Sequence, residues 1–120
     1  MTPDRFIDAV MKTVIDDGVE SYKGIFARPG VVTDPYWRRV LELYRSLPGR
    51  QRKVIFEIMR QVQVDTLSEI FGIVDGTSSL NGRFETFELV HKAGRRRVRL
   101  NGDLQDLLLE KEELRARKRA

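Results

Sequence analysis

The sequence predicts a single α+β domain that is mainly helical, with four to five helices and one late antiparallel β-hairpin before a C-terminal helix. Apolar residues first recur at helical spacing, then alternate at about 84–91 and 95–100, and finally return to helical spacing. A chain of 120 residues, 41% hydrophobic and 33% charged, is long and apolar enough for one core. We therefore interpret 1–120 as one domain, in which 114–120 form a basic tail that frays at the helix end.

The N-terminal segment is expected to hold one or two helices. Thr2 is a suitable N-cap and Pro3 suits the first helical position. Asp16-Asp17-Gly18 predicts an end or a break, because carboxylates are unfavourable at a helix C-terminus and glycine adopts the left-handed cap. A second short helix would then cover 19–27. The apolar stripe of the first consists of Phe6, Ile7, Val10, Met11 and Val14.

The middle of the chain is expected to hold an amphipathic helix and then a central one. Asp34-Pro35 repeats the start signal, and Pro48-Gly49 ends the first of the two helices. The next segment, from 50 to about 74, is apolar over so much of its circumference that we expect it at the centre of the domain. Asp65-Thr66 with Glu69 forms a capping-box pattern, which leaves open whether this segment is one helix or two.

The hairpin is predicted from its turn residues and its alternation. With Ala93-Gly94 as a two-residue turn, Leu89 lies opposite Val98 and Glu88 opposite Arg99, and the apolar residues share one face. Asn101-Gly102 is a second turn, after which Asp103 is a suitable cap for the last helix. The buried stripe expected on that helix is Leu104, Leu107, Leu108 and Leu114.

The residue types present exclude several classes of active site. The chain has no cysteine and one histidine, His91, so disulfides, thiolate metal sites and cysteine nucleophiles are excluded. Asp65 and Glu69 are four residues apart, and we interpret them as solvated helix charges rather than an acid–base pair. No calcium loop or nucleotide-binding glycine motif occurs. We therefore expect a protein that is not an enzyme, with no catalytic, cofactor-binding or metal-binding residues.

Basic residues are the clearest functional signal in the sequence. The net charge is +4, and the last seven residues hold four basic side chains and no acid. Such clusters can neutralise phosphates, so nucleic acid is a possible partner. The alternatives are a cross-strand pair of Arg99 with Glu88, and a solvated helix end partnered by Glu112 and Glu113. The predicted contacts are Arg95, Arg96 and Arg97 in the hairpin and Arg115, Arg117, Lys118 and Arg119 in the tail.

Two resemblances concern the second half of the chain. The segments 64–76 (with Phe71-Gly72-Ile73-Val74-Asp75-Gly76) and 100–106 (Leu100-Asn101-Gly102-Asp103-Leu104-Gln105-Asp106) resemble a family of small bacterial proteins without an assigned function, which implies no activity. The segments 47–54 and 68–73 are similar to the DNA-binding region 4 of bacterial sigma factors. That similarity implies a helix-turn-helix whose recognition helix covers 77–84. Glycine and serine in this stretch depart from the pattern, since they are poor helix formers.

A protein-interaction role is the main expectation. The hairpin has an open edge, and Leu109 is one leucine more than a single buried stripe needs, so we predict Leu109 as an interface residue. No leader-like segment or membrane-length apolar run occurs, which predicts a cytoplasmic location without membrane contact. We expect an accessory or regulatory protein that binds a protein partner or itself. Nucleic-acid binding through the hairpin and tail is the alternative.

Overall fold

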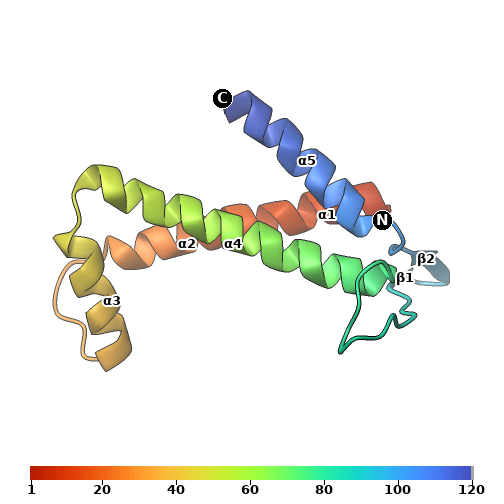
Figure 1. Cartoon of the computed structure of the whole chain (residues 1–120), viewed down its shortest axis with the longest axis horizontal. Helices are drawn as coiled ribbons and strands as arrows, with labels where there is room; N and C mark the ends of the chain where they lie inside the picture. Colours follow the sequence, from red (N-terminus) through yellow and green to blue (C-terminus); the bar gives the residue numbers. More distant parts are fainter. Residues whose placement is uncertain (120) are drawn as a thin grey trace.

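The computed structural model describes residues 1–119, in which the N-terminal helix runs alongside one long helix and the remaining helices lie at the two ends of this pair (Figure 1). A short antiparallel hairpin precedes the C-terminal helix, which confirms the predicted mainly helical α+β fold class. The elements are α1 (Pro3–Val10), η1 (Met11–Asp16), α2 (Asp17–Phe26), α3 (Pro35–Ser46), α4 (Gly49–Asp75), β1 (Val90–Ala93), β2 (Arg96–Arg99) and α5 (Leu104–Arg119).

The first three elements form one continuous helix. Its start is the predicted one: Pro3 occupies the first turn, and the backbone N–H of Arg5 donates to Oγ1 of Thr2 at 3.2 Å. The predicted break at Asp16-Asp17-Gly18 is wrong, because the helix widens into the π-helical turn η1 and continues as α2. The carboxylates are therefore inside a helix and not at its C-terminus.

Gly18 does not end the helix. It lies inside α2, close to the side chain of Gln63. A Cβ atom at this position would lie 2.8 Å from Nε2 of Gln63, which belongs to α4. A side chain at position 18 would therefore force the Gln63 amide to move.

The central helix α4 is uninterrupted. It runs for 27 residues, so the second N-terminus considered at Asp65-Thr66 does not form. Before it, α3 begins as predicted, with the N–H of Trp37 donating to Oδ1 of Asp34 at 3.0 Å. At its end, Gly76 adopts the left-handed conformation with φ 83°, a common helix C-cap.

The hairpin forms two residues out of the expected register. His91 lies opposite Val98, so the two-residue turn is Gly94-Arg95 and not Ala93-Gly94. Gly94 has φ 62° and Arg95 has no positive φ, which is the pattern of a type II′ turn with glycine at its first central position. A shift of two residues preserves the side-chain faces. Arg99 lies opposite Val90 instead of Glu88, and the first strand begins only at β1, leaving 84–89 outside it.

The main core lies where the first helix, the C-terminal half of α4 and α5 meet. Leu104 and Leu108 are buried there as predicted, but Leu114 is half exposed because α5 diverges from the other helices towards its C-terminus (Figure 1). The buried cluster consists of Ile7, Met11, Ile15, Val64, Phe71, Leu104 and Leu108. Aromatic residues form a second cluster at the opposite end, around Tyr22, Phe26, Trp37, Tyr44 and Phe56.

The molecule is elongated. It measures 50 × 36 × 35 Å, and its radius of gyration is 18.0 Å. A compact chain of this length would have a radius of gyration of about 14 Å. The hairpin lies at one end and α3 at the other, where α3 projects from the pair formed by α2 and α4 (Figure 1).

Candidate interaction surface

An apolar groove lies between α2, α3 and α4 at the aromatic end of the molecule. Its volume is about 540 Å³. Val40 and Leu43 of α3 form one wall, and Ile55, Ile58 and Val62 of α4 form the other. The groove is also lined by Tyr22, Phe26, Tyr36, Tyr44, Met59 and Gln63.

Two of the residues that line the groove, Phe26 and Tyr44, belong to a cluster of packed aromatic rings. The Phe26 ring lies 4.8 Å from that of Tyr44 and 5.6 Å from that of Phe56, measured between ring centroids. These distances are in the range of favourable aromatic pairs. The rings join the ends of α2 and α3 to the start of α4.

Arginine side chains hold the two walls at their angle. Nε of Arg52 donates to the carbonyl oxygen atoms of Tyr44 and Leu47, at 3.1 and 2.8 Å. These carbonyls lie at the C-terminus of α3, where that of Tyr44 also accepts from the N–H of Leu47 at 3.2 Å. Arg45 donates to the carbonyl of Arg28 at 2.9 Å and so ties α3 to the preceding loop. Arg52, near the start of α4, and Arg45 of α3 therefore have structural roles.

The walls of the groove expose large apolar side chains next to one another. Leu43 is 61% exposed, Ile58 58% and Val62 57%. Gln63 also lines the groove, although its Oε1 atom is buried and has no hydrogen-bond partner within residues 1–119. Sequence reasoning interpreted the apolar circumference of α4 as burial at the centre. The same pattern also indicates an exposed apolar surface, because part of α4 is not covered by another helix.

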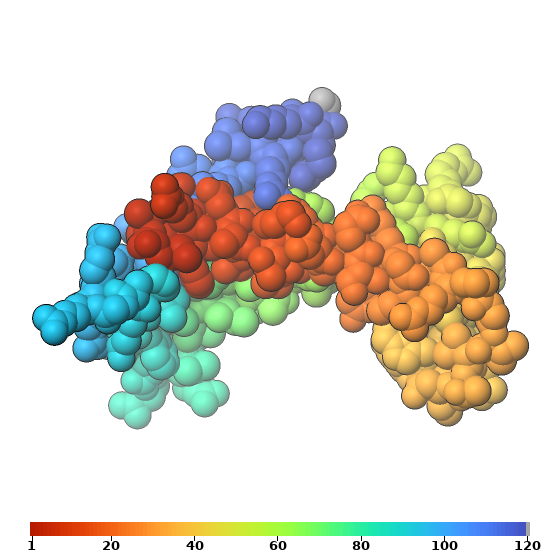
Figure 2. Space-filling model, turned by 180° about the vertical axis from the view of Figure 1, so that it is seen from behind, coloured from red at the N-terminus to blue at the C-terminus, as the bar shows by residue number. Residues whose placement is uncertain are grey.

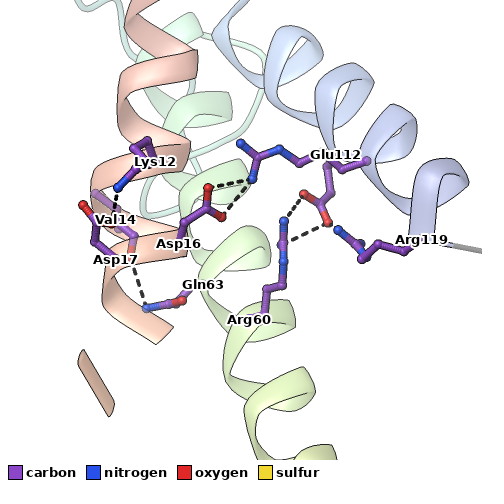
Figure 3. A network of polar contacts seen from close by, with 9 residues as sticks. Lys12, Val14, Asp16, Asp17, Arg60, Gln63, Glu112 and Arg119 are labelled. Atoms are coloured by element: carbon purple, nitrogen blue, oxygen red, sulfur yellow. Dashed lines mark hydrogen bonds and ion pairs between the residues drawn. The ribbon is translucent and has the colours of Figure 1, made fainter. Parts of the chain in front are cut away.

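The basic tail is helical and largely ion-paired. Arg115 donates to both carboxylate oxygens of Asp16, at 2.9 and 3.1 Å, and joins α5 to η1. Glu112 accepts two hydrogen bonds from Arg60 and one from Arg119 (Figure 3). Arg117 pairs with Glu113 at 2.7 Å. This agrees with the alternative interpretation of the tail, in which Glu112 and Glu113 are partners of its basic residues. Among the described residues, Lys118 has no ion pair; Ala120 lies outside them.

The hairpin arginines are placed differently. Arg95, Arg96 and Arg97 are exposed, and none of them forms an ion pair with any residue from 1 to 119. Arg99 donates to Oδ1 of Asn101 at 3.3 Å. The hairpin and the end of α5 lie far apart in both views (Figures 1 and 2). The two predicted groups of nucleic-acid contacts therefore do not form one patch.

The two segments that resemble a bacterial family meet at the junction of α4, the hairpin and α5. Asn101 is buried, accepts from the N–H of Leu89 at 2.8 Å and donates to the carbonyls of Val74 and Phe87, both at 2.7 Å. Asp75 accepts from the N–H of Gln105 at 2.9 Å.

The contacts at this junction show that the predicted cap of α5 was wrong. The carboxylate that receives an N–H from the first turn of α5 belongs to Asp75, whereas Asp103 was expected to cap this helix. The side chain of Gln105 also donates to the carbonyl of Ser68 at 3.0 Å. Sequence reasoning did not find these contacts, because the partners are about 30 residues apart. Residues 77–84 form turns and one isolated bridge, Leu80 with Arg83, and not the helix that the sigma-factor similarity implies.

Leu109 is exposed on α5, as expected of an interface residue, but it does not line the groove. In the described part of the chain, no three His, Asp or Glu side chains gather as a metal site would require. None of the helices between residues 1 and 119 is both long and apolar enough to cross a membrane. Comparison with models of known protein families, with curated proteins and with solved structures finds no match.

Proposed function

We propose that this protein is a small, non-enzymatic, cytoplasmic accessory or regulatory protein that acts through protein–protein contacts. We further propose that the groove between α2, α3 and α4 is its contact surface. One observation supports this most directly: Leu43, Ile58 and Val62 are each more than half exposed along the walls of the groove. Adjacent exposed apolar side chains cost free energy in water, and a contiguous patch of this kind is typical of protein-binding surfaces.

Photo-crosslinking tests this proposal. A benzoylphenylalanine residue replaces Leu43 in the groove, and a matched variant carries it at Asp106, which is exposed on α5 outside the groove. After irradiation in the native host, we expect position 43 and not position 106 to form a covalent adduct with another polypeptide. Mass spectrometry of the adduct identifies that polypeptide. If neither position forms an adduct, the proposed function is wrong.

Nucleic-acid binding is a second candidate, favoured by the three consecutive hairpin arginines, which form no ion pair with any of residues 1–119. If this role is correct, fluorescence anisotropy with duplex or single-stranded oligonucleotides detects binding that weakens steeply with salt. Replacing Arg95, Arg96 and Arg97 by glutamine would abolish it. Arg117→Gln with Lys118→Gln is the matched control at the tail, and leaves the Arg115 and Arg119 ion pairs intact. Absence of binding at low salt would exclude this candidate.

A further inference from the structure

The helices that form the groove walls begin in a basic part of the chain. Residues 35–57, which cover α3, the turn after it and the start of α4, hold six basic side chains and two acidic ones, Glu42 and Glu57. The net charge of this basic segment is therefore +4, equal to that of the whole chain. Figure 2 shows this end of the molecule as a lobe. A partner that approaches the groove therefore meets a positive charge.

Most of these basic side chains are not used inside the protein. Four of them are exposed, and none of the four forms an ion pair or donates a side-chain hydrogen bond within residues 1–119: Arg38, Arg39, Arg50 and Lys53. Arg39 follows Tyr36 by three residues and precedes Leu43 by four, so it lies on the face of α3 that forms the groove wall. These charges are available to an anionic partner.

The lining of the groove favours a helix as its occupant. An extended segment has backbone N–H and C=O groups that need partners once they are buried. The only polar side-chain groups in the lining are the hydroxyls of three tyrosines and the amide of Gln63. A helix pairs its own backbone groups and presents apolar residues at i, i+3, i+4 and i+7. The α4 wall has the same spacing, with Ile55, Ile58, Met59 and Val62.

The hairpin end of the molecule shows how a helix covers this helix pair. There α5 buries Leu104 and Leu108 against the first helix and α4. Glu112 of α5 accepts two hydrogen bonds from Arg60 of α4, at 3.1 and 3.0 Å. The covering helix thus combines an apolar face with a carboxylate that pairs with a basic residue of α4. The groove offers the same two features, apolar walls and unpaired basic side chains.

We propose that the groove binds an acidic amphipathic helix of a partner protein. This inference rests on the proposed function and defines the chemistry of the partner. Apolar side chains of that helix cover Leu43, Ile58 and Val62, and its carboxylates face Arg39 and the other unpaired basic residues. The charges speed association and discriminate against basic partners. A second copy of this chain would bring another basic segment to the interface, where like charges oppose binding.

Fluorescence anisotropy with two labelled synthetic peptides tests the proposal. Each peptide has about 14 residues, or four helical turns, with leucine at i, i+3, i+4 and i+7 of one face. The opposite face carries glutamate in one peptide and lysine in the other. We expect the full chain to bind the acidic peptide at micromolar concentration and the lysine peptide at least about tenfold more weakly, with a smaller difference in high salt. Equal affinities would overturn the inference, as would no binding of the acidic peptide at about 100 μM.

Glutamine variants test whether the groove is the binding surface. Leu43→Gln and Ile58→Gln each remove an apolar side chain without adding charge, and each should weaken binding of the acidic peptide about tenfold. Leu109→Gln is the matched control outside the groove and should leave binding unchanged. Both groove side chains are more than half exposed, so the helical signal in circular dichroism should persist, and each variant checks the other. An equal loss in Leu109→Gln would overturn the proposal.

Charge removal tests the basic segment in the same way. A triple variant replaces Arg38, Arg39 and Lys53 by glutamine, and should weaken binding of the acidic peptide about tenfold at low salt. The matched control removes three charges from the hairpin by replacing Arg95, Arg96 and Arg97 with glutamine. We expect this control to bind as the wild type does. If the hairpin variant loses binding and the α3–α4 variant retains it, the inference is wrong.

The crosslinking experiment separates this inference from the proposed function. The partner segment attached to position 43 should be acidic and amphipathic when mass spectrometry identifies it. If that segment is basic, or belongs to another copy of this chain, the function stands and the inference fails. Co-sedimentation with phosphatidylglycerol vesicles that Leu43→Gln abolishes would assign the groove to a membrane surface and overturn the inference. If neither crosslinking position forms an adduct, the proposed function itself fails.

Discussion

The two ends of this molecule are built on the same pair of helices but are covered to different extents. At the hairpin end, α5 packs across the first helix and α4, and Ile7, Leu104 and Leu108 lose all contact with solvent. At the α3 end, Phe26 and Tyr44 of the aromatic cluster line a groove whose walls remain exposed. With a rise of 1.5 Å per residue, α5 is about 24 Å long and α4 about 40 Å. The difference teaches that a third helix closes a core only along the length it covers.

The largest expected difference between the two ends is in the free energy of unfolding that is lost when a leucine is replaced by alanine. Leu108→Ala removes a fully buried side chain, so we expect the free energy of unfolding to fall by about 2–5 kcal/mol. Leu43→Ala removes an exposed one and should change it by no more than about 0.5 kcal/mol. Urea unfolding followed by circular dichroism measures both. Equal losses would show that the groove end is as well packed as the core.

The second effect concerns the junction at the closed end. Asn101→Ala leaves the N–H of Leu89 and the carbonyls of Val74 and Phe87 without their partner, at a cost of about 1–3 kcal/mol. Amide hydrogen exchange should become faster at Leu89. Asn101→Asp retains the acceptor but loses both donated hydrogen bonds, and should also destabilise. If Asn101→Ala leaves stability unchanged, this network does not hold the hairpin on α4.

Two glycine substitutions should have opposite signs. A Cβ at Gly72 would collide with Oγ of Ser78 and lie 2.8 Å from Nε2 of Gln105, so Gly72→Ala should destabilise by about 1–3 kcal/mol. At Gly24, in α2, a Cβ would meet nothing within 4 Å, so Gly24→Ala should stabilise by about 0.5–1 kcal/mol. Thermal unfolding compares the two variants with the wild type. If both variants change the stability in the same direction, the proposed difference in packing between the closed end and the open end is wrong.

The smallest effect is an ion-pair cluster between α1 and α5. Hydrogen bonds to Asp4 and then Asp8 raise the pKa of Lys111 above its usual 10.5, and the Nζ–Oδ1 distances are 2.9 and 3.0 Å. A raised pKa in the folded state adds stability that is fully present below pH 10.5 and is lost as the pH rises through the folded value. Lys111→Met should cost less than about 1 kcal/mol at pH 7. The difference in Tm between the two proteins should shrink above pH 10.5, and a constant difference would exclude this linkage.

Local signals in the sequence predicted the elements well where neighbouring residues decide the structure. Thr2-Pro3 and Asp34-Pro35 start helices because a side-chain oxygen satisfies an N–H three residues later. Glycine at the hairpin turn was also a correct signal, although Gly94 occupies its first central position and not its second. The prediction that the helix breaks at Gly18 was wrong. Glycine can end a helix, but it also occurs inside helices where a neighbouring side chain comes close. The residues that flank Gly18 do not reveal that Gln63 lies beside it.

The sequence by itself determined the fold class, the starts of the first helix and α3, the apolar face of the hairpin and the placement of Leu109 on the surface. Only the tertiary structure decided which carboxylate caps α5, which tail arginines are ion-paired, and which apolar face of α4 stays open. These outcomes depend on residues tens of positions apart, such as Asp75 with Gln105 and Asp16 with Arg115. Periodicity identifies an apolar face, but burial requires a second element long enough to cover it. Here α5 covers only one end of the helix pair.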